Sequence, residues 1–165
     1  MERTADLIDK VLRRIGNGFA WTIVLLMLAI VVQVVLRYGF DITSIKLEEM
    51  QWHLYAMGMM LGLSYALGTD DHIRVDVIQS RLSARTRAVI DILGTLFLLL
   101  PFATFLFIES LPFVQHAFQI QERSNAPSGL PWRWLIKGFI PAGCLLLILS
   151  GLSHLLRSIV ALRTK

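Results

Sequence analysis

The side chains that could take part in acid–base, metal or haem chemistry are few and widely spaced. The 165 residues hold four histidines, one cysteine and twelve carboxylates. They form no His-Glu-x-x-His, no Gly-x-Ser-x-Gly and no carboxylate pair inside an apolar stretch, so hydrolytic catalysis is not predicted. A single cysteine, Cys144, excludes an intrachain disulfide and a cysteine metal cluster. We therefore predict that the chain is not an enzyme and carries neither metal nor cofactor.

The histidines leave one alternative open. A b-type haem needs two imidazoles on facing helices at one depth. His53 and His154 are expected at opposite membrane faces and cannot share a haem, whereas His72 with His154, or His53 with His116, remain conceivable pairs. The alternative function is therefore a haem-binding membrane anchor of a redox complex.

Four long apolar stretches position all of these residues. Each has about the 20 residues needed to cross a hydrocarbon core of roughly 30 Å. The first has only Thr22 and Gln33 as polar interruptions, without the polar stripe of a soluble core helix. We predict one integral membrane domain over residues 1–165, with transmembrane helices at about 19–37, 47–68, 88–112 and 134–157.

Two further helices are expected outside the spans. Apolar residues recur at helical spacing in the leader, which we predict to be an amphipathic helix on the inner surface that turns at Gly16 and Gly18. Val75, Ile78 and Leu82 recur in the loop at 69–87, which indicates a short cytoplasmic interfacial helix, with a solvated loop as the equal alternative. Ser83 is placed to cap the third span. The predicted fold is thus all-α.

Basic residues predict the orientation. With four spans, the termini and the middle loop share one side, which holds eleven of the sixteen lysines and arginines. Cytoplasmic segments carry this excess, so both termini are predicted to be cytoplasmic. The net charge of +4 comes from residues flanking the apolar stretches, which favours membrane lipids over nucleic acid as a partner.

The membrane interior offers packing surfaces and no ion pathway. The ionisable residues of the spans lie near span ends, and none is expected at a bilayer midplane, where a pathway would need a carboxylate. Gln33 and Thr95 are expected to form hydrogen bonds between helices. Gly58, Gly62 and Ala66 repeat every four residues, which predicts a close helix-packing face.

The order of landmarks is similar to that of one family. They are Leu36-Arg37-Tyr38; Glu48-Glu49 followed by Trp52-His53; His72-Ile73-Arg74-Val75-Asp76; Glu122-Arg123-Ser124; Gly129-Leu130-Pro131-Trp132; and Pro141-Ala142-Gly143. Over nearly its whole length the chain resembles the small permease subunit, of DctQ type, of tripartite ATP-independent periplasmic (TRAP) transporters.

The resemblance implies that the chain lies in the bacterial inner membrane and has two protein partners. One is expected in the same membrane and the other in the periplasm. In this family a large permease subunit carries the solute and sodium ions, and a periplasmic binding protein captures the solute. The small subunit is expected to brace the large one during sodium-driven uptake of an organic acid. A self-sufficient small transporter is the third hypothesis.

The motif residues are expected to be mainly structural. Arg37, Glu48 and Glu49 can pair across the outer end of the first two spans, and His72, Arg74 and Asp76 can shape a cytoplasmic turn. The other motif residues that the resemblance singles out are Trp52, Glu122, Pro131, Trp132, Pro141 and Gly143.

Overall fold

The computed structural model describes residues 2–68 and 82–163, and the described part is helical with short connections. The elements are α1 (Glu2–Phe40), α2 (Ile45–Gly68), α4 (Ala84–Gly94), the π-helical turn η1 (Thr95–Leu99), α5 (Leu100–Gln119) and α6 (Arg133–Arg163). The all-α prediction is confirmed for these residues.

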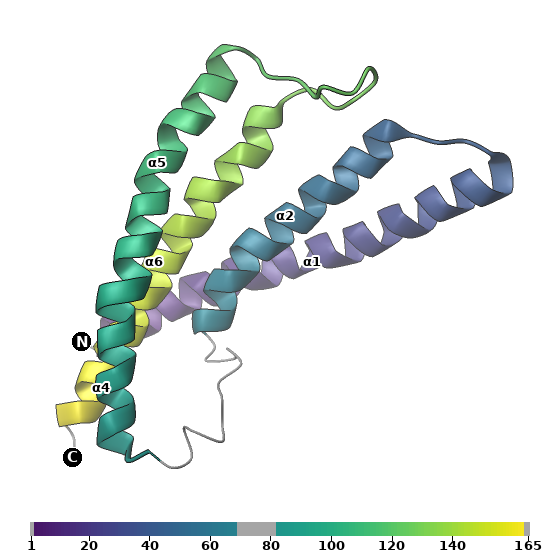
Figure 1. Cartoon of the computed structure of the whole chain (residues 1–165). Helices are drawn as coiled ribbons and strands as arrows, with labels where there is room; N and C mark the ends of the chain where they lie inside the picture. Colours follow the sequence, from purple (N-terminus) through teal and green to yellow (C-terminus); the bar gives the residue numbers. More distant parts are fainter. Residues whose placement is uncertain (1, 69–81, 164–165) are drawn as a thin grey trace.

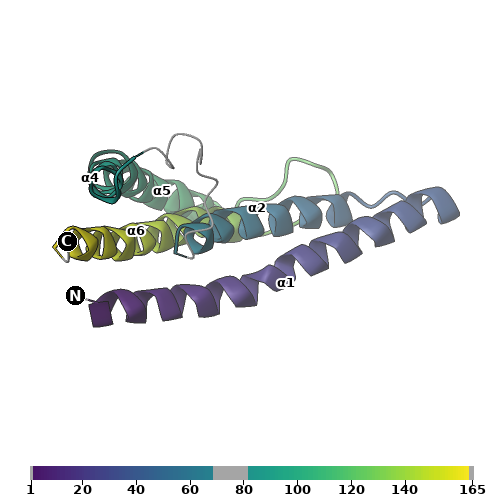
Figure 2. The ribbon, with the colours of Figure 1, turned by 90° about the horizontal axis from the view of Figure 1, so that it is seen from below.

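The helices run lengthwise beside one another in three layers. In Figure 2, α1 lies on one side, α2 and α6 lie in the middle, and α4 and α5 lie on the other side. The middle helix α6 contacts α1, α2, α4, η1 and α5. Both termini and the start of α4 lie at one end of the bundle, here the terminal end (Figure 1). The α1–α2 connection and the α5–α6 loop lie at the other end, here the loop end.

Three helical stretches of the described part are long and apolar enough to cross a membrane. They are Ala5–Phe40, Arg85–Gln119 and Arg133–Val160. Helix α2 has 24 residues, a length of roughly 36 Å. Its first half carries Glu48, Gln51 and His53, which lower its apolar character. The chain is thus a multi-pass membrane protein, and a span by α2 stays a prediction.

The predicted break between leader and first span is wrong. Helix α1 continues from Glu2 to Phe40 without a turn at Gly16 or Gly18. Gly16 serves packing instead, because a Cβ atom there would lie 2.1 Å from Cδ2 of Tyr65 in α2. Ala5 and Leu12, 1% and 3% exposed, belong to the stripe that α1 buries against the bundle. Part of the leader's apolar face, including Leu12, thus lies in a helix–helix contact, whereas Leu7 and Val11 are 63% and 52% exposed.

The third span is longer than predicted and contains a π-helical turn. Ser83 caps α4 as expected, its Oγ accepting a hydrogen bond of 3.1 Å from the Thr86 N–H. Within η1 the Leu100 N–H bonds to the Thr95 carbonyl, five residues back. Pro101 follows directly and cannot donate a backbone hydrogen bond, which accounts for the locally widened helix. The interfacial helix predicted around Val75 and Ile78 lies outside the described residues.

Helix α6 approaches α2 most closely at Gly143. A Cβ atom there would lie 3.0 Å from the backbone oxygen of Met60. A backbone atom cannot move aside as a flexible side chain can, so the separation of α2 and α6 depends on this glycine. Pro141, two residues earlier inside α6, is also buried.

We predict that Gly143→Leu destabilises the bundle by roughly 1–3 kcal/mol, as overpacking does. Thiol labelling of Cys144, which is 7% exposed, during heating in detergent reports the unfolding midpoint. Gly138→Leu is the matched control, because a Cβ at Gly138 meets nothing within 4 Å. Equal midpoints for the two variants would contradict the close approach.

Candidate functional site

At the loop end, Glu49 of α2 holds the loop between α5 and α6. Ser124 Oγ donates to Oε1 of Glu49, and the Leu130 N–H donates to Oε2 at 2.6 Å. Within the loop, the Ala126 N–H donates to Ser124 Oγ at 3.2 Å, and the Gly129 N–H donates to the Ala126 oxygen at 3.0 Å. These contacts, here the Glu49 clamp, tie residues 124–130 to a helix about 80 positions earlier. The clamp fixes the shape of this face.

A second set of contacts closes the α5–α6 hairpin beside the clamp. Lys137 Nζ lies 2.5 Å from Glu122 Oε2 and 3.9 Å from the centre of the Phe113 ring. The backbone N–H of Arg133 donates a hydrogen bond of 3.1 Å to the backbone oxygen of Glu122. Lys137 is therefore neutralised at the membrane edge by one carboxylate and one aromatic face.

A polar hollow of about 380 Å³ opens next to the clamp. It is lined by Ile45, Glu48, Glu49, Trp52, His53 and Arg133. His53 Nδ1 lies 2.5 Å from the Glu49 backbone oxygen, and Trp52 is 66% exposed. The hollow combines carboxylates, an imidazole and a guanidinium, so it presents both hydrogen-bond donors and acceptors.

Between the two ends, polar side chains join helices. Gln51 Nε2 donates to Gln33 Oε1 at 2.5 Å and to the Ala29 oxygen at 3.1 Å, which joins α2 to α1. The prediction for Gln33 is confirmed. Thr95 Oγ1 lies 3.5 Å from His154 Nδ1, so Thr95 also contacts a neighbouring helix. These contacts satisfy polar groups that lipid cannot.

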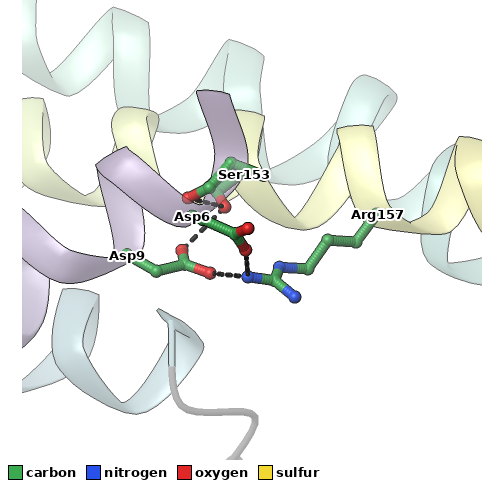
Figure 3. A network of polar contacts seen from close by, with 5 residues as sticks. Asp6, Asp9, Ser153 and Arg157 are labelled. Carbon is green, nitrogen blue, oxygen red and sulfur yellow. Dashed lines mark hydrogen bonds and ion pairs between the residues drawn. The ribbon is translucent and has the colours of Figure 1, made fainter. Parts of the chain in front are cut away.

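At the terminal end, α1 is tied to α6 by a cluster of charges (Figure 3). One Arg157 nitrogen lies 2.9 Å from Asp6 Oδ1 and 2.5 Å from Asp9 Oδ2. Ser153 Oγ donates to the other Asp9 oxygen at 2.7 Å. Asp9 is only 8% exposed, so Arg157 and Ser153 supply the partners that a buried carboxylate needs.

This cluster was not predicted from the sequence. Asp9 lies between Ala5 and Leu12 on the stripe that α1 buries, a spacing visible in the sequence. Its partners lie nearly 150 residues away, so only the packing of α1 on α6 reveals them.

The predicted packing residues differ in their surroundings. A Cβ at Gly58 would lie 3.2 Å from Thr22 Oγ1, so this glycine faces α1. Gly62 is exposed, with nothing within 4 Å of its Cβ position, and Ala66 is partly exposed. The face therefore divides between an internal contact and an open surface.

Of the motif residues that the structure describes, Glu48, Glu49 and Trp52 line the polar hollow, and Arg37 does not. Glu49 binds the α5–α6 loop, whereas the Arg37 guanidinium lies 5.8 Å from the neighbouring Tyr38 ring. Trp132 is 62% exposed and adopts a φ of 67° at the start of α6, directly after Pro131. The motif residues His72, Arg74 and Asp76 lie outside the described residues.

A large apolar cavity of about 820 Å³ borders the π-helical turn. Asp91, Thr95 and His154 supply its polar edge. Within residues 2–68 and 82–163, no group of three or more His, Cys, Asp or Glu side chains could hold a metal ion. His53 lies in the first turns of α2 and His154 near the end of α6, at opposite ends of the bundle.

We predict that Glu49→Gln frees the loop, because the carboxylate loses its charge and one acceptor. The Leu130 N–H bonds to a charged oxygen in the wild type, so the Leu130 amide should exchange with deuterium several-fold faster in the variant. Hydrogen exchange with mass spectrometry measures this rate. Glu48→Gln, an exposed neighbour outside the clamp, should leave the rate unchanged, and equal rates in both variants would refute the clamp.

Comparison with known proteins gives the family. No curated protein matches the chain. The family model described as the DctQ component of tripartite ATP-independent periplasmic transporters matches residues 26–161, which cover the C-terminal part of α1 and every later element up to the last turn of α6. The chain therefore belongs to the DctQ family, the small membrane subunits of TRAP transporters.

Proposed function

We propose that this chain braces the large permease subunit of a sodium-driven TRAP transporter that imports an organic acid. In this proposal a periplasmic binding protein delivers the acid to the outer face. The family match over residues 26–161 carries the proposal. The large subunit would supply the solute and sodium sites.

The packing of the chain supports a bracing role. Its polar contacts join helices at the two ends and between them, through the Glu49 clamp, the Gln33–Gln51 pair and the Arg157 cluster. Each contact serves to fix one helix against another. Such a bundle suits a scaffold that keeps its shape while a partner moves.

We propose four spans, with the terminal end in the cytoplasm. The α2 helix, at roughly 36 Å, is long enough to cross a core of about 30 Å. Its packing against α1 and α6 supports the same depth for α2. The excess of basic residues at the termini and in the middle loop supports the orientation. A reporter enzyme fused after Lys165 should be active in the cytoplasm, and periplasmic activity would reverse the orientation.

An exposed stripe on α2 is the surface we propose for the large subunit. Trp52, Tyr55 and Met59 are 66%, 54% and 51% exposed, and Gly62 and Ala66 continue the same face at helical spacing. A glycine on a face open to the membrane permits another helix backbone to approach closely. The stripe also begins at the polar hollow beside the Glu49 clamp.

Co-purification tests the proposed partner. Affinity capture of the tagged chain from native membranes should retain a large multi-pass permease, and Gly62→Leu should reduce that permease several-fold by blocking close approach. Gly39→Leu is the control, because Gly39 also has nothing within 4 Å of its Cβ position but lies off the stripe. Full retention of the permease by Gly62→Leu would exclude this face.

A further inference from the structure

The first half of α1 carries a basic face that the described contacts leave unused. Lys10 and Arg14 are four residues apart, as are Arg13 and Asn17, so these residues share one side of the helix, and all four are exposed. Within residues 2–68 and 82–163, no carboxylate pairs with Lys10, Arg13 or Arg14. We refer to these four residues as the basic face.

The basic face borders a hollow at the terminal end. The hollow measures about 470 Å³ and is lined by the four residues together with Asp6, Asp9 and Arg157. Both aspartates are already engaged by Arg157, at 2.9 Å and 2.5 Å. The two carboxylates therefore compete little for Lys10, Arg13 and Arg14, and the hollow keeps a net positive charge that favours an anion.

The same side of α1 becomes apolar where the basic face ends. Trp21, Val24 and Leu28 continue its spacing and are 68%, 43% and 57% exposed. At 1.5 Å per residue, Trp21 lies roughly 10 Å from Arg14 along the helix. One continuous surface thus presents cations at headgroup level and then an apolar strip at acyl-chain depth.

We propose that this surface binds one anionic phospholipid in the membrane leaflet at the terminal end. The phosphate would accept hydrogen bonds from Arg13, Arg14 and Lys10, and an acyl chain would lie along Trp21, Val24 and Leu28. A free phosphate would match only the cations, and an acidic protein segment would leave the apolar strip without a partner. The continuity of the two zones therefore favours a lipid. A bound lipid here would lie beside the contact between α1 and α6, since Asp9 and Arg157 also line the hollow.

Tryptophan quenching tests the proposal with the full chain. The chain is reconstituted in vesicles of brominated phosphatidylcholine, with or without brominated phosphatidylglycerol, and bromine quenches nearby indoles. The difference between wild type and Trp21→Phe isolates Trp21, because Trp52, Trp132 and Trp134 lie at the loop end. We expect Trp21 to associate with phosphatidylglycerol on the order of tenfold more strongly than with phosphatidylcholine, because phosphatidylglycerol carries the net negative charge that the basic face attracts.

Variants assign the preference to named side chains. The double variant Arg13→Gln with Arg14→Gln should bring the ratio of the two association constants close to one. Arg37→Gln with Lys46→Gln removes the same charge at the loop end and should leave the ratio unchanged. All four substituted residues are exposed, so the variants should fold as the wild type does. The lipid preference of the wild type is measured without any substitution.

Three results would overturn the proposal. Equal association constants of the wild type for the two lipids would show that the basic face does not select an anionic lipid, and would favour an acidic protein partner instead. An unchanged ratio in the Arg13 and Arg14 double variant would place the lipid elsewhere. Loss of the preference on adding millimolar inorganic phosphate would show a site for the free anion, whereas we expect no displacement because phosphate lacks the acyl chains.

Discussion

The close packing of the other helices on α6 is the constraint on which the rest of the structure depends. Small residues make this possible: a Cβ at Gly143 would press on the Met60 backbone, and a Cβ at Gly151 would lie 2.5 Å from a Leu99 side-chain carbon at the π-helical turn. Apolar burial gives membrane helices little reason to associate, because lipid is as apolar as leucine. Close backbone approach and interhelical hydrogen bonds must therefore set the arrangement. The position of α6 therefore constrains the positions of the helices that contact it, which are α1, α2, α4 and α5.

Polar contacts then lock the arrangement at its two ends. Glu49 fastens the α5–α6 loop to α2, and Arg157 fastens the start of α1 to the end of α6. Both contacts join segments far apart in the sequence, so they hold the bundle as one unit. Between them the Gln33–Gln51 hydrogen bond adds a contact within the apolar layer, where it has no competition from bulk water. The result is a bundle joined at both ends with apolar outer faces, as expected for the supporting role that we propose.

Much of the fold follows from the sequence, because apolar length and helical spacing are local signals. The capping by Ser83 and the inter-helix bond of Gln33 were predictable from residue type. The continuity of α1 was not predictable, because a glycine such as Gly16 can mark either a turn or a close helix contact. The proximity of the Tyr65 ring to Gly16 shows that it is a close contact. The partners of Glu49 and Asp9 also could not be predicted, since pairing across 75 to 148 positions depends on how the helices pack.

The central claim is that this chain supports transport without carrying solute or ions itself. Sodium-driven uptake into proteoliposomes tests it most directly, with the chain alone, the large permease alone and both together. If this chain only supports the large permease, we expect uptake of an organic acid only where both subunits are present, with the binding protein supplied outside. Uptake by this chain alone, or full uptake by the large permease without it, would contradict this supporting role.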